Sequence, residues 1–156
     1  MNEDYIKLLI GFPIFRGFTP DGGRMLIERG EIKEFAPGEV IWREGDAAAC
    51  VLVMLTGKLQ VFVVRQERDL VLSEPGPGAI LGELAVLCAI PRSASTRALE
   101  KSVALCWSDK AFRRLLLGDA FLSERILGEA LRMFIERERA MIDSLVARQR
   151  GEKTAP

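Results

Sequence analysis

Two charged residues that flank a short apolar segment are the strongest candidates for chemistry in this sequence. Glu83 directly follows Gly82, and Arg92 directly follows Pro91. Good helix formers fill residues 83–88, so we expect a short helix there, with a strand beginning near Arg92. The first backbone N–H groups of such a helix have no partners within it and favour a bound anion. Gly82 has no side chain, so a ligand can approach the backbone at that point.

The side chains around this segment suit a small ligand that carries one anionic group and one hydroxyl. The guanidinium group of Arg92 presents a rigid set of N–H donors that fits a phosphate, and the hydroxyl of Ser93 can add another contact. The carboxylate of Glu83 can accept a hydrogen bond from a sugar hydroxyl, and its charge is expected to orient Arg92. A triphosphate would require more positive charge or Mg²⁺. We therefore predict a site for one phosphate charge and one ribose hydroxyl.

The rest of the sequence indicates a mainly β domain with helices on either side. Short apolar runs separated by turn residues recur through residues 31–107, which is typical of a sandwich or barrel. The pattern is helical at 4–10 and 19–29, and again at 108–117 and 120–148. We expect one domain over 1–150, divided into N-terminal helices (1–30), a β-roll (31–107) and C-terminal helices (108–150), followed by a tail (151–156).

The last predicted helix carries a seam of apolar residues with heptad spacing. The seam consists of Leu127, Leu131, Phe134, Met141 and Leu145, with Glu138 in the remaining position. Two interpretations stay open. The seam packs on the chain's own β domain, or it pairs with a second copy of the chain in a parallel coiled coil.

Composition excludes several classes of function. The sequence has no histidine, which removes Ser-His-Asp catalysis and histidine metal sites. Its 22 basic and 22 acidic residues balance, which argues against a dedicated DNA-binding surface. Cys50, Cys88 and Cys106 are expected to be small core residues in a reducing cytosol. The sequence shows neither a membrane span nor a signal peptide, so a cytoplasmic protein is expected.

Two sequence segments together resemble a known ligand-binding motif. Gly82-Glu83-Leu84-Ala85, followed by Pro91-Arg92-Ser93-Ala94, resembles the phosphate-binding cassette of the cyclic-nucleotide-binding domain superfamily. Members include the catabolite activator protein, the regulatory subunits of cAMP-dependent protein kinase and cyclic-nucleotide-gated channels. The resemblance extends to residues 37–41, 44–46 and 55–61. It implies an eight-stranded β-roll, a double-stranded β-helix or jelly roll, with flanking helices.

The resemblance also implies roles for the residues of the cassette. Glu83 would bind the ribose 2′-hydroxyl, and Arg92 would bind the cyclic phosphate. Ser93 and the backbone amides near Leu84 and Ala85 would bind the remaining phosphate oxygens. The same binding segments include Gly82 and Ala94.

The identity of the base and of the residue that covers it is less closely specified. Ser93 stands where related domains often carry threonine with cGMP or alanine with cAMP, and we expect cAMP to be preferred. Phe134 or Met133 on the last helix is expected to stack on the base. The chain departs from the family pattern at Ala49 and Leu52, where an aspartate and an aromatic residue are common.

These observations predict a non-catalytic sensor of cAMP or cGMP, with no metal and no other cofactor. Members of the transcription-factor branch carry a DNA-binding domain after the long helix, and none is expected in the six residues after 150. The signal would pass through movement of the last helix to an unidentified partner protein or to a second copy. The alternatives are a constitutive interaction module with a pocket that no longer binds, and a sensor of another small anionic effector.

Overall fold

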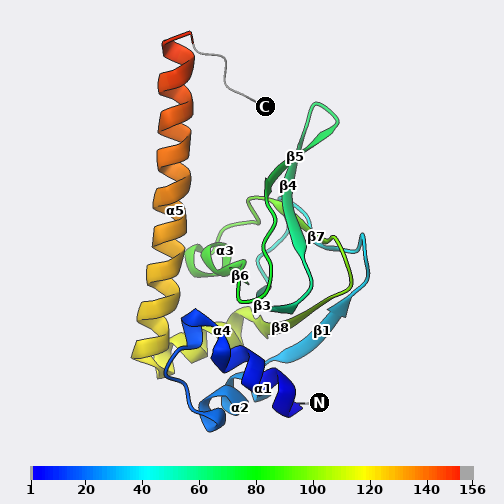
Figure 1. The fold of residues 1–156 in the computed structure, drawn as a ribbon, viewed down its shortest axis with the longest axis vertical. Helices are drawn as coiled ribbons and strands as arrows, with labels where there is room; N and C mark the ends of the chain where they lie inside the picture. The colour runs from blue at the N-terminus through cyan, green and yellow to red at the C-terminus, as the bar shows by residue number, and fades with distance from the viewer. Residues whose placement is uncertain (1, 152–156) are drawn as a thin grey trace.

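The computed structural model describes residues 2–151 and begins with a set of short helices (Figure 1). They are α1 (Asn2–Gly11), η1 (Pro13–Phe15) and α2 (Pro20–Glu28). The α2 helix begins as its sequence predicts, because the Thr19 hydroxyl accepts a hydrogen bond from the Gly22 amide at 3.2 Å and proline occupies the first helical position. α1 is longer than the predicted 4–10 segment.

Within the described residues, eight strands form two four-stranded antiparallel sheets. One sheet has the order β1-β8-β3-β6 and the other β2-β7-β4-β5. The strands are β1 (Glu31–Phe35), β2 (Val40–Trp42), β3 (Cys50–Thr56), β4 (Leu59–Arg65), β5 (Arg68–Ser73), β6 (Ile80–Leu81), β7 (Ser95–Ala98) and β8 (Ser102–Ser108). The predicted β-roll with flanking helices is confirmed. The strand expected to begin near Arg92 begins later, at Ser95.

The core joins the N-terminal helices to the first sheet. Trp107 on β8 is fully buried and stacks against Phe112. Its indole Nε1 donates a hydrogen bond to the Leu26 carbonyl on α2 at 2.8 Å. Burial of large side chains is the main stabilising term in such a domain. The helices therefore belong to the same packed unit as the roll.

Three further helices lie beside the roll (Figure 1). α3 (Glu83–Cys88) is inserted between β6 and β7, as predicted. α4 (Asp109–Gly118) is capped by Ser108, and α5 (Ala120–Gln149) is capped by Asp119. Only the first part of α5 is buried, and its later turns stand clear of the roll in Figure 1. None of the helices in residues 2–151 is long and apolar enough to cross a membrane.

The prediction that all three cysteines belong to the core is wrong for Cys88. Cys106 is buried and Cys50 is half-buried, but Cys88 is exposed. It is the last residue of α3, a helix whose buried side holds Ala85 and Val86. Burial raises the pKa of the Cys106 thiol to about 12, so this thiol remains protonated at neutral pH.

Candidate functional site

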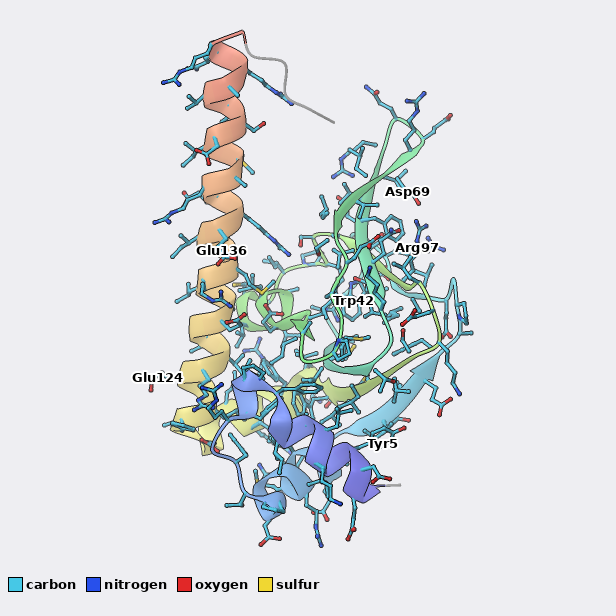
Figure 2. The ribbon with its side chains drawn as sticks, in the orientation of Figure 1. Tyr5, Trp42, Asp69, Arg97, Glu124 and Glu136 are labelled. Atoms are coloured by element: carbon cyan, nitrogen blue, oxygen red, sulfur yellow. The ribbon has the colours of Figure 1, made fainter. Side chains whose placement is uncertain are left out.

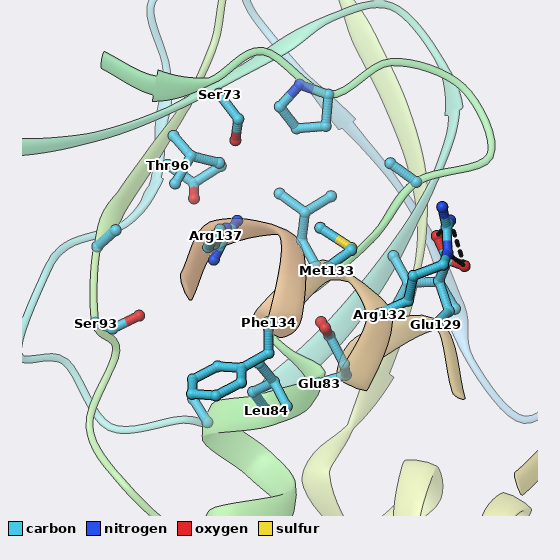
Figure 3. A pocket seen from close by; sticks show the side chains of 18 of the residues that line it. Ser73, Glu83, Leu84, Ser93, Thr96, Glu129, Arg132, Met133, Phe134 and Arg137 are labelled. Carbon is cyan, nitrogen blue, oxygen red and sulfur yellow. Dashed lines mark hydrogen bonds and ion pairs between the residues drawn. The ribbon is translucent and has the colours of Figure 1, made fainter. Parts of the chain in front are cut away.

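A cavity of about 740 Å³ lies between the roll and α5, in the size range of small-molecule sites (Figure 3). All the site residues predicted from sequence border it: Gly82, Glu83, Leu84, Ala85, Arg92, Ser93, Ala94, Met133 and Phe134. The first seven come from α3, the glycine before it and the segment after it, and the last two come from α5. The structure therefore brings together residues that are about 50 positions apart in the sequence.

Arg92 occupies the floor of this cavity and is only 4% exposed. Its Nη1 donates to the Gly82 carbonyl at 3.1 Å, and its Nη2 donates to the Cys50 carbonyl at 2.6 Å. The guanidinium carbon lies 3.9 Å from the ring centroid of Trp42, which Figure 2 places inside the roll. Burial lowers the pKa of Arg92, because the charged form has lost water. Two carbonyls and an aromatic face thus fix the orientation of a buried cation.

One donor of Arg92 has no acceptor. Among the described residues, the Arg92 Nε atom is the only fully buried side-chain nitrogen or oxygen without a hydrogen-bond partner. A buried donor in that state is costly, and nearly all such groups in folded proteins are paired. The arrangement suits a bound anion that accepts from the free N–H groups of the guanidinium.

Glu83, at the start of α3, is 7% exposed and points into the cavity (Figure 3). Burial raises the pKa of its carboxyl. Its own backbone amide and the positive charges of Arg137 and Arg92 act in the opposite direction. No ion pair or hydrogen bond joins Glu83 and Arg92 among the described residues, so Glu83 acts on Arg92 through the attraction of their charges alone. The hydrogen bonds that hold the guanidinium group run to the carbonyls of Gly82 and Cys50.

α5 forms the opposite wall of the cavity. Met133 is half-buried, while Phe134 is 57% exposed and lies near Leu84 in Figure 3. Arg132 pairs with Glu129 at 2.5 Å and with Glu136 at 3.3 Å along the helix surface. This wall combines an apolar face with charged groups at its margins.

The sequence model of a protein family, described as the cyclic nucleotide-binding domain, matches residues 32–119, which is more than half of the chain. The chain belongs to the cyclic nucleotide-binding domain family. The matched range includes both Glu83 and Arg92.

Similarity to individual proteins agrees with this assignment. A cAMP-dependent protein kinase regulatory subunit from Blastocladiella emersonii is 32% identical over 105 residues, which are 67% of this chain and 26% of that protein. The structure of a cyclic nucleotide-binding-like protein from Brucella abortus is 32% identical, with a TM-score of 0.60, over 72% of this chain and 97% of that one. The catabolite activator protein of Thermus thermophilus shares the fold, with a TM-score of 0.77 at 22% identity over 86% of this chain and 63% of that one. The chain spans between about a quarter and two fifths of the length of the curated relatives that it matches first.

The cyclic nucleotide-binding domain also connects its cassette helix to the C-terminal helices. Arg113 on α4 donates a hydrogen bond to the Val86 carbonyl on α3. Ala89, which follows α3, has a φ of 53° and closes that helix in a left-handed conformation. Arg125 on α5 donates to the carbonyls of Ile14 and Arg16. Side-chain hydrogen bonds therefore join α3 to α4, and α5 to the segment around η1.

Sequence reasoning missed several residues that border the cavity. Trp42 lies 50 positions before Arg92, and no local motif marks it as part of the site. Ser73 and Thr96 come from β5 and β7 and add hydroxyl groups. Arg137 is not among the predicted site residues, yet it borders the cavity one turn after Phe134. The helical spacing of residues 133, 134 and 137 is a signal that could have revealed it.

We expect Glu83→Gln to stabilise the ligand-free protein at neutral pH. Because burial raises the pKa of Glu83, the stability contributed by the protonated group is present at low pH and is lost as pH rises through that pKa. Glutamine resembles the protonated acid at every pH. Thermal unfolding should show a melting temperature higher by about 2–4 °C, the shift that ~1 kcal/mol produces in a chain of this size. The difference should vanish below about pH 4, where carboxyl groups are protonated in both states.

The matched control for this measurement is Glu124→Gln, which changes an exposed acid on α5. We expect that variant to melt within about 2 °C of wild type, as for surface substitutions generally. A melting temperature of Glu83→Gln that is equal to or below wild type at neutral pH would contradict this prediction. It would show that nearby amides and positive charges offset the cost of burying the ionised Glu83 carboxylate.

Proposed function

We propose that this chain binds a cyclic mononucleotide and acts as a non-catalytic regulatory module. The observation that carries the proposal is Arg92, a buried cation on the floor of the cavity with an unpaired Nε donor. A cyclic phosphate supplies one negative charge and acceptor oxygens to such a group. Relatives named as cAMP-dependent kinase subunits make cAMP the first nucleotide to test, and Ser93 considered alone favours cAMP over cGMP.

The proposed arrangement places each part of the ligand against a group of matching chemistry. The phosphate lies on Arg92, with Ser93 and the amides of Leu84 and Ala85 as further donors. The ribose hydroxyl donates to Glu83, whose buried carboxyl has no ion-pair partner among the described residues. The base extends towards α5, where the flat ring of Phe134 and the side chain of Met133 provide apolar contacts.

Calorimetric titration of the purified chain with cAMP and with cGMP tests this function. Saturable binding of one molecule per chain is expected, and the nucleotide should be recovered chemically unchanged. Absence of heat with both nucleotides would contradict the proposal and favour an interaction module or a different anionic effector. Hydrolysis of the nucleotide would contradict the non-catalytic part alone.

We also propose that ligand binding changes the position of α5. Ligand draws α3 towards the cavity, and the bond from Arg113 to the Val86 carbonyl transmits that movement to α4. The ligand can shift this equilibrium only by the difference between its affinities for the two positions. Hydrogen exchange across residues 120–148 should therefore change when nucleotide is added, and unchanged exchange there would contradict the coupling.

The exposed seam of α5 supports pairing with a second copy. Its apolar residues are between 41% and 65% exposed: Leu127, Leu131, Phe134, Met141 and Leu145. The buried side of α5 is formed by Leu122, Ile126 and Ala130. Of the seam residues, Phe134 alone borders the cavity, so most of the seam does not pack on the chain's own roll. We expect light scattering to give twice the 17.3 kDa mass of one chain. A single-chain mass would favour a separate partner protein.

A further inference from the structure

We propose that Arg137 reads the polar edge of the purine and gives this pocket a preference for guanine over adenine. The proposal rests on the proposed function, since it concerns the base of the cyclic nucleotide bound at Arg92 and Glu83. It assigns a specificity-determining role to a residue outside the phosphate-binding cassette.

Arg137 borders the same cavity from the α5 side. Figure 3 shows its side chain at the turn of α5 on the side of the strand segment that carries Ser93 and Thr96. It lies one helical turn after Phe134, so it continues the wall against which the base is proposed to lie. The cavity therefore has a cation at each side, with Arg92 on the floor and Arg137 on the wall.

The guanidinium group of Arg137 also has no protein partner among residues 2–151. Its neighbour Arg132 pairs with Glu129 and Glu136, but no ion pair or side-chain hydrogen bond involves Arg137 in that part of the chain. Its charge nevertheless acts on the site, because it lowers the pKa of Glu83 more than the charge of Arg92 does. A guanidinium group facing the ligand space without a protein partner is free to donate to a bound molecule.

The chemistry of the two purines decides which base this group favours. Guanine presents two acceptors, O6 and N7, along one edge, and arginine commonly donates to both of them. Adenine presents N7 beside the N6 amino group, which is itself a donor and opposes the N–H groups of arginine. The hydroxyls of Ser73 and Thr96 can donate or accept, so they fit either base. Arg137 is donor-only, and the discrimination therefore falls to it.

This inference opposes the preference for cAMP expected from Ser93. Both nucleotides carry the same charge on the phosphate, so the interaction with Arg92 does not separate them. A contact to the base edge adds to that common interaction for one nucleotide only. Comparison of the two dissociation constants in matched variants thus isolates the contribution of Arg137.

The test is calorimetric titration of wild type, Arg137→Met and Arg139→Met with cGMP and with cAMP. Methionine keeps most of the apolar stem and removes the donors. Arg139 is exposed on the same helix and does not border the cavity, so Arg139→Met is the matched control. In wild type and in Arg139→Met we expect cGMP to bind about tenfold more tightly than cAMP, the usual scale of a bidentate contact to guanine. In Arg137→Met the ratio should fall towards one, through weaker binding of cGMP.

The possible outcomes separate this inference from the proposed function. A ratio that is the same in wild type and Arg137→Met overturns the specificity role, and so does an equal loss of affinity for both nucleotides. Preference for cAMP in wild type also overturns it. No heat with either nucleotide in wild type overturns the proposed function, and this inference with it.

Discussion

Arg92→Lys is expected to weaken binding of both cAMP and cGMP by about a hundredfold or more, on the scale of losing one partner of a buried hydrogen-bonded charge pair. Lysine keeps the positive charge but not the planar set of donors. In the folded chain the Arg92 guanidinium already donates to the carbonyls of Gly82 and Cys50 while stacking on Trp42. A lysine ammonium cannot satisfy both carbonyls, keep this stacking geometry and bind a phosphate. Calorimetric titration under the conditions used for wild type measures the loss.

Arg97→Lys is the matched control for this substitution. Arg97 lies on β7, five residues after Arg92, and its Nη1 pairs with Asp69 at 2.7 Å on the outside of the roll (Figure 2). It does not border the cavity, so we expect its replacement to leave the affinity within about twofold, as for surface changes generally. Thermal unfolding of both variants separates loss of ligand from loss of fold. An affinity of Arg92→Lys within threefold of wild type would mean that another group holds the phosphate.

Features set by neighbouring residues were predictable from the sequence. The start of α2 at Thr19 and Pro20 depends on a cap and a proline that are adjacent in the chain. The short helix α3 follows from its helix formers between Gly82 and Pro91. The β-roll was predicted from the resemblance of the cassette to a known motif, because proteins that share such a motif usually share the fold around it.

Features that depend on distant partners were not predictable. The Cys50 carbonyl that holds Arg92 comes from β3, 42 positions earlier, and a backbone carbonyl leaves no mark in the sequence. Opposite charges on Glu83 and Arg92 suggested a pair, yet the buried guanidinium is oriented by carbonyls and an aromatic ring instead. For Arg137 the sequence offered only its helical spacing from Met133 and Phe134, and its place at the cavity followed from the position of α5.

Gly82→Ala is expected to impair both ligand binding and stability, although it adds only one methyl group. Gly82 has a φ of 85°, a left-handed conformation that costs an L-residue about 1–2 kcal/mol. The added Cβ would also collide with Arg92 Nη1 and lie 3.1 Å from the Cys50 carbonyl oxygen. Arg92 cannot move away cheaply, because its displacement breaks the bond to Cys50 and leaves a buried cation unpaired. We expect a loss of nucleotide affinity of more than about tenfold, since misplacement of a single buried charge has effects of that size.

Gly38→Ala separates backbone strain from displacement of Arg92. Gly38 has a φ of 82°, almost that of Gly82, but a Cβ at this turn would meet no atom within 4 Å. Both variants therefore carry similar strain, and only Gly82→Ala also disturbs the site. We expect Gly38→Ala to lower the melting temperature by about 2–8 °C, the shift from ~1–2 kcal/mol in a chain of this size, and to bind nucleotide like wild type. If the two variants lose nucleotide affinity equally, the geometry of Arg92 is not what binding depends on, because strain alone would then account for both.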